Sequence, residues 1–257
     1  MILPEINPVL IEIGPLAIRW YGISWLVAFF TIYLLAKNRL SFLSENQLSD
    51  LMFYGLLGAV IGGRVGYMLF YNIDQLGANI FSIFYIWQGG LSFHGGLLGV
   101  LVTAVILSKR WKISFFDIMD FIASCVPFGL GWVRIGNFLN AELLGRETSL
   151  PWGVIFPGDL LGLSRHPSQI YQAFSEAFLL GFFLLWFAKQ QRPKKSISAL
   201  FLIGYGLIRC LTEMFREPDS HIGFDLFDAI TRGQLLSVPM ILAGFIILAY
   251  SYKYNKR

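Results

Sequence analysis

The sequence predicts an all-α integral membrane protein with seven transmembrane helices, the N-terminus outside and the C-terminus in the cytoplasm. Its composition is the first reason: of 257 residues, 56% are hydrophobic and 14% charged, and the mean hydropathy is +0.62. Such values lie outside the usual range of a soluble domain. Because an open sheet cannot satisfy its backbone polar groups in lipid, we expect a helix bundle.

The second observation is a set of apolar runs, each close to the roughly 20 residues that a helix needs to cross the hydrocarbon core. No second domain or internal repeat is apparent, so we predict one transmembrane domain over residues 1–257. The predicted spans are 17–37, 50–71, 91–108, 115–138, 167–188, 197–214 and 233–252.

The third observation is the distribution of cations between the two sides. With the N-terminus outside, every lysine of the chain falls in the inner connections or the C-terminal tail. The positive-inside rule predicts this bias for the cytoplasmic side. Four arginines accompany the lysines on the inner side: Arg39, Arg110, Arg192 and Arg257. The eight remaining cations lie in helices or outside, and all of them are arginine: Arg19, Arg64, Arg134, Arg146, Arg165, Arg209, Arg216 and Arg232. A planar guanidinium suits bidentate recognition of phosphate or carboxylate, so the pattern indicates an anionic ligand.

Three of these arginines interrupt apolar spans. Arg64, Arg134 and Arg209 lie roughly 17–25 Å from the predicted inner ends of their helices, in a core about 30 Å thick. His94, near the start of the third span, has a similar depth. Charges inside a membrane helix are costly and tend to face the bundle or a water-filled cavity. We therefore expect a polar layer in the outer half of the membrane.

Each residue of this layer also has a structural interpretation. For Arg64, a structural role, by snorkelling outward or by pairing with Asp74, is as compatible with the sequence as a ligand role, and His94 is also compatible with a purely structural role. Arg134 has Asn137 three residues later, and Arg209 is followed by Glu213 at helical spacing, which favours a functional site. Outside the spans, His166 and His221 fit surface or capping positions.

Two glycine stripes mark expected helix contacts. Gly58, Gly62 and Gly66 lie in the second span, and Gly95 and Gly99 in the third. Small residues at this spacing let membrane helices approach closely, so packing alone explains them.

Six ordered motifs resemble those of the bacterial prolipoprotein diacylglyceryl transferase family, and together they cover nearly the whole chain. They are WYG (20–22), GGRVGYMLFYN (62–72), GGLSFHGG (89–96), RIGNFLNAELLGR (134–146), HPSQIYQ (166–172) and YGLIRCLTEMFREPD (205–219). The chain departs from common family residues at Val133, Ala141 and Gln172. Only the last removes a charge, so no role is assigned to position 172.

The resemblance implies a multi-pass enzyme of the bacterial inner membrane with its active site toward the periplasm. Such an enzyme transfers the diacylglyceryl group of phosphatidylglycerol to the lipobox cysteine of a prolipoprotein signal peptide. A thioether forms and glycerol phosphate leaves. The expected partners are therefore phosphatidylglycerol, prolipoproteins and membrane lipids, with no cofactor, no metal and no nucleic acid.

The resemblance also implies the site residues. We expect His94, Arg134 and Arg209 to be catalytic, with the arginines stabilising charge on the leaving phosphate. His94 is a candidate base for the thiol, and positioning the phosphate is its alternative role. Glu142 and Glu213 are expected to orient the arginines, and Asn137 and Tyr21 to bind the headgroup. The expected substrate-binding residues are Arg134, Tyr21, Arg64, Asn137, Glu142, Gly145, Tyr205 and Glu213.

Two other classes remain open on the residues alone. A transporter or channel for a small anion would also place arginines in the membrane, although an inverted repeat, which would favour a transporter, is not apparent. A seven-helix receptor or scaffold explains the topology but not the arginine layer. Thioether formation by the purified protein distinguishes the enzyme from both.

Overall fold

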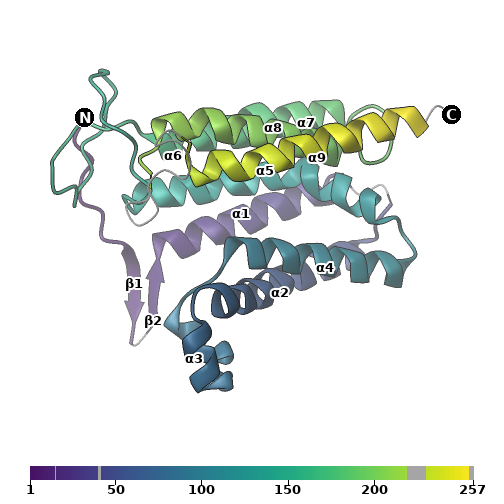
Figure 1. Cartoon of the computed structure of the whole chain (residues 1–257), viewed down its shortest axis with the longest axis horizontal. Coiled ribbons are helices and arrows are strands. Elements are labelled where there is room, and N and C mark those ends of the chain that lie inside the picture. Colours follow the sequence, from purple (N-terminus) through teal and green to yellow (C-terminus); the bar gives the residue numbers. More distant parts are fainter. Residues whose placement is uncertain (15, 40–41, 219–229, 255–257) are drawn as a thin grey trace. The chain divides into compact units, whose positions relative to one another are not determined.

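The computed structural model describes residues 1–14, 16–39, 42–218 and 230–254 (Figure 1). Seven helices in these ranges are long and apolar enough to cross a membrane, which confirms the predicted all-α, multi-pass fold. They span Trp20–Lys37, Glu45–Phe70, Phe93–Trp111, Phe115–Leu139, Ser168–Phe187, Ser196–Phe215 and Arg232–Tyr254. The orientation of the termini and the single domain stay predictions.

The chain forms two compact units, which we describe separately. The first comprises Met1–Leu35 and Asp120–Arg257, and the second comprises Ala36–Met119.

The first unit begins with an antiparallel hairpin of β1 (Val9–Ile13) and β2 (Leu16–Arg19), which leads directly into α1 (Trp20–Lys37). Its other long helices are α5 (Phe115–Leu139), α8 (Ser196–Thr212) and α9 (Arg232–Tyr254), and α8 and α9 run side by side (Figure 1). A short helical turn, η4 (Glu213–Phe215), extends the end of α8. Residues 219–229, which include Asp219 and His221, lie outside the described residues.

The fifth span is not a regular α-helix. It begins as α6 (Ser168–Ala173), continues as a π-helical segment, η3 (Phe174–Gly181), and ends as α7 (Phe182–Phe187). Pro167 immediately precedes α6, and its side chain makes no capping hydrogen bond. π-Helical turns are rare, and those that occur are often at functional sites. This segment is therefore a candidate part of a functional site.

Glycines bring α5 close to its neighbours in the first unit. A Cβ on Gly131 would lie 2.4 Å from Cβ of Ala177 in η3, and one on Gly136 would lie 2.3 Å from Oγ of Ser24 in α1. These distances are too short for any larger residue. The backbone of α5 is therefore packed directly against both segments.

In the second unit, α2 (Glu45–Phe70) packs against α4 (Phe93–Trp111) through the predicted glycine stripes. A Cβ on Gly62 would lie 2.3 Å from the carbonyl oxygen of Gly95, and one on Gly99 would lie 1.9 Å from that of Gly58. The packing role expected for these glycines is thus confirmed. The connection between the two helices contains α3 (Ile73–Ala78) and the short turns η1 (Ile80–Phe84) and η2 (Ile86–Gln88).

α2 begins at Glu45, five residues before the predicted boundary. Ser44 and Gln47 form a capping box: the Ser44 hydroxyl accepts from the Gln47 amide at 3.2 Å, and the Gln47 side chain accepts from the Ser44 amide at 2.9 Å. Caps of this kind satisfy backbone donors in water, so the helix extends past its apolar part.

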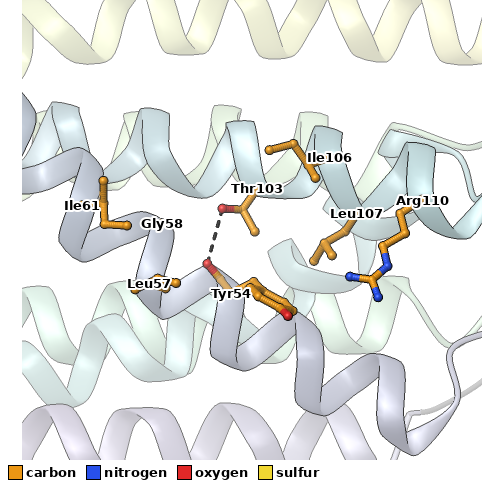
Figure 2. A pocket seen from close by; sticks show the side chains of 8 residues that line it. All are labelled: Tyr54, Leu57, Gly58, Ile61, Thr103, Ile106, Leu107 and Arg110. Carbon is orange, nitrogen blue, oxygen red and sulfur yellow. Dashed lines mark hydrogen bonds between the residues drawn. The ribbon is translucent and has the colours of Figure 1, made fainter.

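A groove runs along the α2–α4 pair toward Arg110, away from the start of α4. Figure 2 shows its lining, with the hydroxyl of Thr103 donating to the backbone carbonyl of Tyr54 at 3.3 Å. Apart from Thr103 and Arg110, its lining side chains are Tyr54, Leu57, Ile61, Ile106 and Leu107. The groove is therefore largely apolar.

Candidate active site

Arg134 lies on α5 and points at a buried acid. Its Nε contacts Oε2 of Glu176 at 3.5 Å; the Glu176 side chain is 0% exposed and that of Arg134 is 17% exposed. Gly131, one helical turn before Arg134, is the residue packed against Ala177, which follows Glu176. The close contact between α5 and η3 thus sets the distance of the ion pair.

Arg209 lies at the end of α8 in a second cluster of charges. Its Nη2 is 2.9 Å from Oε2 of Glu213, and Nη1 of Arg216 is 3.3 Å from the other oxygen of the same carboxylate. One carboxylate therefore contacts two arginines. Among the described residues, the buried Nη1 of Arg209 has no hydrogen-bond acceptor.

The carboxylate of Glu213 lies against the first turn of α9. A Cβ on Gly233 would approach both Cδ and Oε2 of Glu213 to 3.0 Å. Thr231 and Gln234 cap this turn, because the Gln234 side chain accepts from the Thr231 amide at 3.1 Å and the Thr231 hydroxyl accepts from the Gln234 amide at 3.4 Å. The N-terminus of a helix favours negative charge, so α9 helps to hold the acid in place.

The two arginine clusters belong to one site. Arg134 and Arg209 are close enough to repel each other electrostatically, both interact with Tyr205, and Tyr205 also interacts with Glu176. The sequence predicted Arg134, Tyr205, Arg209 and Glu213 as site residues, and the structure brings all four together. Two guanidinium groups with spare donors in a buried setting form a site suited to an anion with several oxygens.

Other predicted residues lie at the C-terminal end of α5. Asn137 is buried and donates to Oε2 of Glu142 at 3.1 Å, while Asn140 donates to Oε1 at 3.3 Å. Glu142 thus meets two amides, and not the arginine that we expected. The ring of Tyr21, on α1, lies beside Gly136 of α5, where these two helices pack closely.

Gly145 occupies a tight crossing of three segments. A Cβ at this position would lie 2.0 Å from the carbonyl oxygen of His166, and backbone bridges pair Gly145 with Arg216 and Glu147 with Arg165. The segment after α5 is therefore tied to the start of α6 and to the segment after α8. This explains why glycine is required here without giving the residue a contact to substrate.

Arg165 stabilises the same region after α5. Its Nε donates to Oδ2 of Asp159 at 2.7 Å, its Nη2 donates to Oδ1 at 3.3 Å, and its Nη1 donates to the carbonyl of Gly145 at 3.1 Å. The hydrogen bonds from Arg165 hold the pKa of Asp159 below its ordinary value. Nearby, burial lowers the pKa of His166, whose Nδ1 lies 3.2 Å from the hydroxyl of Tyr171.

Arg64 and His94 belong to the second unit. Arg64 donates to the carbonyls of Ser82 at 2.8 Å and Ile83 at 3.1 Å, and also to those of Gly89 and Gly90. This arrangement differs from both structural alternatives, pairing with Asp74 and snorkelling, because the guanidinium is buried on backbone oxygens. His94 is exposed in the first turn of α4, with its ring against that of Phe93.

Glu176 and Gln169 were not predicted as site residues from the sequence. Glu176 is an acid within the apolar run AFSEAFLLGFF, a signal equal to the one that identified Arg134. Gln169 is fully buried and donates from Nε2 to the carbonyl of Glu142 at 2.5 Å, a contact that only the fold reveals. Among the described residues, no three His, Cys, Asp or Glu side chains gather as metal ligands would.

Fold and site together define a multi-pass membrane protein with partly buried arginines paired to buried acids. The family model for prolipoprotein diacylglyceryl transferase matches residues 8–250. The chain therefore belongs to the prolipoprotein diacylglyceryl transferase family.

Curated relatives named phosphatidylglycerol–prolipoprotein diacylglyceryl transferase match almost the full length. The protein of Acinetobacter baylyi is 49% identical over 257 residues, which cover 97% of this chain and 94% of the relative. That of Acinetobacter baumannii is 48% identical with the same coverage. That of Photobacterium profundum is 50% identical over 255 residues, covering 97% of this chain and 95% of the relative.

Proposed function

We propose that this protein transfers the diacylglyceryl group of phosphatidylglycerol to the lipobox cysteine of a prolipoprotein signal peptide, the first step of lipoprotein maturation. The family and the names of the relatives support this reaction. The structural observation that carries it is the partly buried pair of Arg134 and Arg209, in which the buried Nη1 of Arg209 has no acceptor among the described residues.

The reaction forms one bond and breaks one. The cysteine sulfur attacks the glycerol carbon that bears the phosphate, a carbon–sulfur bond forms, and the carbon–oxygen bond breaks. Its electron pair leaves on the phosphate oxygen, so glycerol phosphate departs, and the thiol proton passes to a base. Negative charge grows on the leaving phosphate, and fixed guanidinium groups in a partly dry site stabilise that charge more in the transition state than in the ground state.

The roles of the site residues follow from this chemistry. Arg134 and Arg209 bind the phosphate and are the catalytic cations. Glu213 holds Arg209, while Tyr205, which interacts with both arginines, contributes a hydroxyl to the headgroup site. Tyr21, Asn137, Glu142 and Gly145 shape the outer end of this site.

His94 is the proposed base, because a thiol with an ordinary pKa of about 8.5 reacts as the thiolate and benefits from a proton acceptor. His94→Gln is expected to lower turnover far more than lipid binding. Equal losses in both would assign His94 to phosphate positioning. The substrate-binding role predicted for Arg64 also stays a prediction, which its exchange for lysine tests below.

The proposed setting is the bacterial inner membrane, with the N-terminus and the active site on the periplasmic side. The distribution of lysines supports this orientation. Reporters fused after Lys112 and Lys195 should report the cytoplasm, and reporters fused near Asp74 and Asp159 the periplasm. One inverted reporter contradicts the orientation.

The direct test of function uses purified protein, phosphatidylglycerol and a lipobox peptide. Mass spectrometry should detect the peptide with an added diacylglyceryl group, and a peptide with serine for the lipobox cysteine should stay unmodified. Movement of the headgroup across vesicles without thioether product would instead support an anion transporter.

A further inference from the structure

We infer that Glu176 is a positioning residue, which fixes the guanidinium of Arg134 in the orientation that binds the phosphate. This inference rests on the proposed transferase function. It assigns a task to an acid that lies outside the six motifs and that no part of the proposed mechanism yet uses.

The burial of Glu176 is the first argument. Its side chain is 0% exposed in a span of high hydropathy, and among the described residues its Oε1 has no hydrogen-bond partner. A carboxylate in such surroundings is costly to bury unless it is paired, and even a pair often contributes little net stability. Stability alone is therefore a poor reason for an acid at this position.

The geometry of the ion pair is the second argument. Oε2 of Glu176 meets Nε of Arg134, on the side of the guanidinium nearest the stem. Contact at Nε fixes the rotation of the planar group while leaving the terminal nitrogens for other oxygens. An acid that only neutralised the arginine would serve equally well at those terminal nitrogens, where it would block a phosphate.

The backbone around Glu176 is the third argument. Glu176 lies in the π-helical segment η3, and the next residue, Ala177, is packed against Gly131 of α5. Because Gly131 and Arg134 are one turn apart on α5, the backbone contact and the ion pair share one face of that helix. The acid is thus held by rigid packing, as a group that orients another must be.

A double-mutant cycle tests the inference with four proteins: wild type, E176Q, R134K and the double variant. Glutamine keeps the size of Glu176 and removes its charge. If Glu176 acts through Arg134, E176Q should lower thioether turnover at saturating lipid by about 10-fold in the wild-type background and leave R134K nearly unchanged. Equal factors in both backgrounds, or no effect in either, would overturn the inference.

Two further variants separate positioning from folding. Gln172→Ala removes a buried polar side chain one turn earlier, and we expect it to keep turnover per folded molecule near wild type. Glu176→Asp keeps the charge on a shorter stem and should retain more turnover than E176Q. A loss from Gln172→Ala as large as that from E176Q, or equal turnover of E176Q and Glu176→Asp, would show a structural role.

Binding of glycerol phosphate to the same four proteins keeps this inference distinct from the proposed function. Wild-type protein that makes no thioether would contradict the transferase. Even then, E176Q should weaken glycerol phosphate binding in the wild-type background and not in R134K. Equal weakening in both backgrounds would overturn the positioning role by itself.

Discussion

The membrane arginines of the two units differ in what their guanidinium groups meet. In the second unit, Arg64 donates to four backbone carbonyls of the 82–90 connection. In the first unit, Arg134 and Arg209 meet carboxylates and interact with each other, and Nη1 of Arg209 has no acceptor among the described residues. The contacts of the first kind hold a loop, whereas those of the second leave donors for a ligand.

This difference shows that an arginine inside a membrane span identifies a task only through its partners. Backbone carbonyl oxygens accept hydrogen bonds from the guanidinium donors without neutralising the positive charge. Contacts of this kind stabilise the fold. Carboxylates orient a guanidinium, and wherever arginines outnumber the acids, a positive charge remains for an anion.

The largest effect is expected for Arg209→Ala. Loss of this guanidinium removes one phosphate ligand and one of the two arginines that contact Glu213. By analogy with the removal of a transition-state donor, we expect turnover to fall by about 100- to 1,000-fold. Thioether formation at saturating lipid measures this, and a loss below about 10-fold would remove Arg209 from the catalytic set.

Gly233→Ala tests whether the position of the acid matters as much as its presence. The new Cβ would lie 3.0 Å from the Glu213 carboxylate and push it from its place at the start of α9. Small displacements in a site have large kinetic costs, so we expect turnover to fall by about 10-fold. Gly55→Ala is the matched control, because a Cβ on Gly55, in α2, meets nothing within 4 Å. Equal turnover of the two variants would contradict this prediction.

Arg64→Lys tests whether the arginine of the second unit stabilises the fold. A single ammonium cannot reach four carbonyls spread over residues 82–90, so we expect a loss of stability of about 1–3 kcal/mol. Turnover per folded molecule should stay near wild type. Thermal unfolding and thioether formation are measured on the same sample, and a fall in turnover without a loss of stability would support the predicted substrate-binding role of Arg64.

The smallest effect is expected outside the membrane, at the Asp159–Arg165 pair. Because Arg165 holds the pKa of Asp159 below its ordinary value of 3.8, the carboxylate stabilises the fold above that pH. The stabilisation is lost as the pH falls through the lower pKa of the folded state. Asp159→Asn should therefore lower the melting temperature slightly at pH 7, and the difference should shrink on acidification below about pH 4. A difference that is constant with pH would contradict the ion pair.

Much of the fold was predictable because membrane insertion imposes simple rules on composition and length. All seven spans were found, and most boundaries lie within three residues of the prediction. The start of α2 was missed because a capping box extends the helix into polar residues. The π-helical turn in the fifth span was not predicted; in the structure this segment packs closely against Gly131 of α5.

The site was predictable in part. Arg134, Tyr205, Arg209 and Glu213 were found from charge in apolar runs and from motif resemblance, and the structure places them together. Pairings were harder to predict, because they depend on which helix faces which. Glu142 was expected to hold an arginine and meets asparagines, and Glu176, which does hold one, was overlooked.

We propose that the planar guanidinium of Arg134 binds the phosphate of the lipid. Arg134→Lys is the most direct test of this role. Lysine keeps the positive charge, but its ammonium is a point charge and lacks the planar set of donors of a guanidinium. We measure thioether formation at saturating phosphatidylglycerol beside thermal stability, with Arg64→Lys as the comparison. We expect Arg134→Lys to stay folded and to lose about 10- to 100-fold in turnover. Near-normal turnover of folded Arg134→Lys would contradict it.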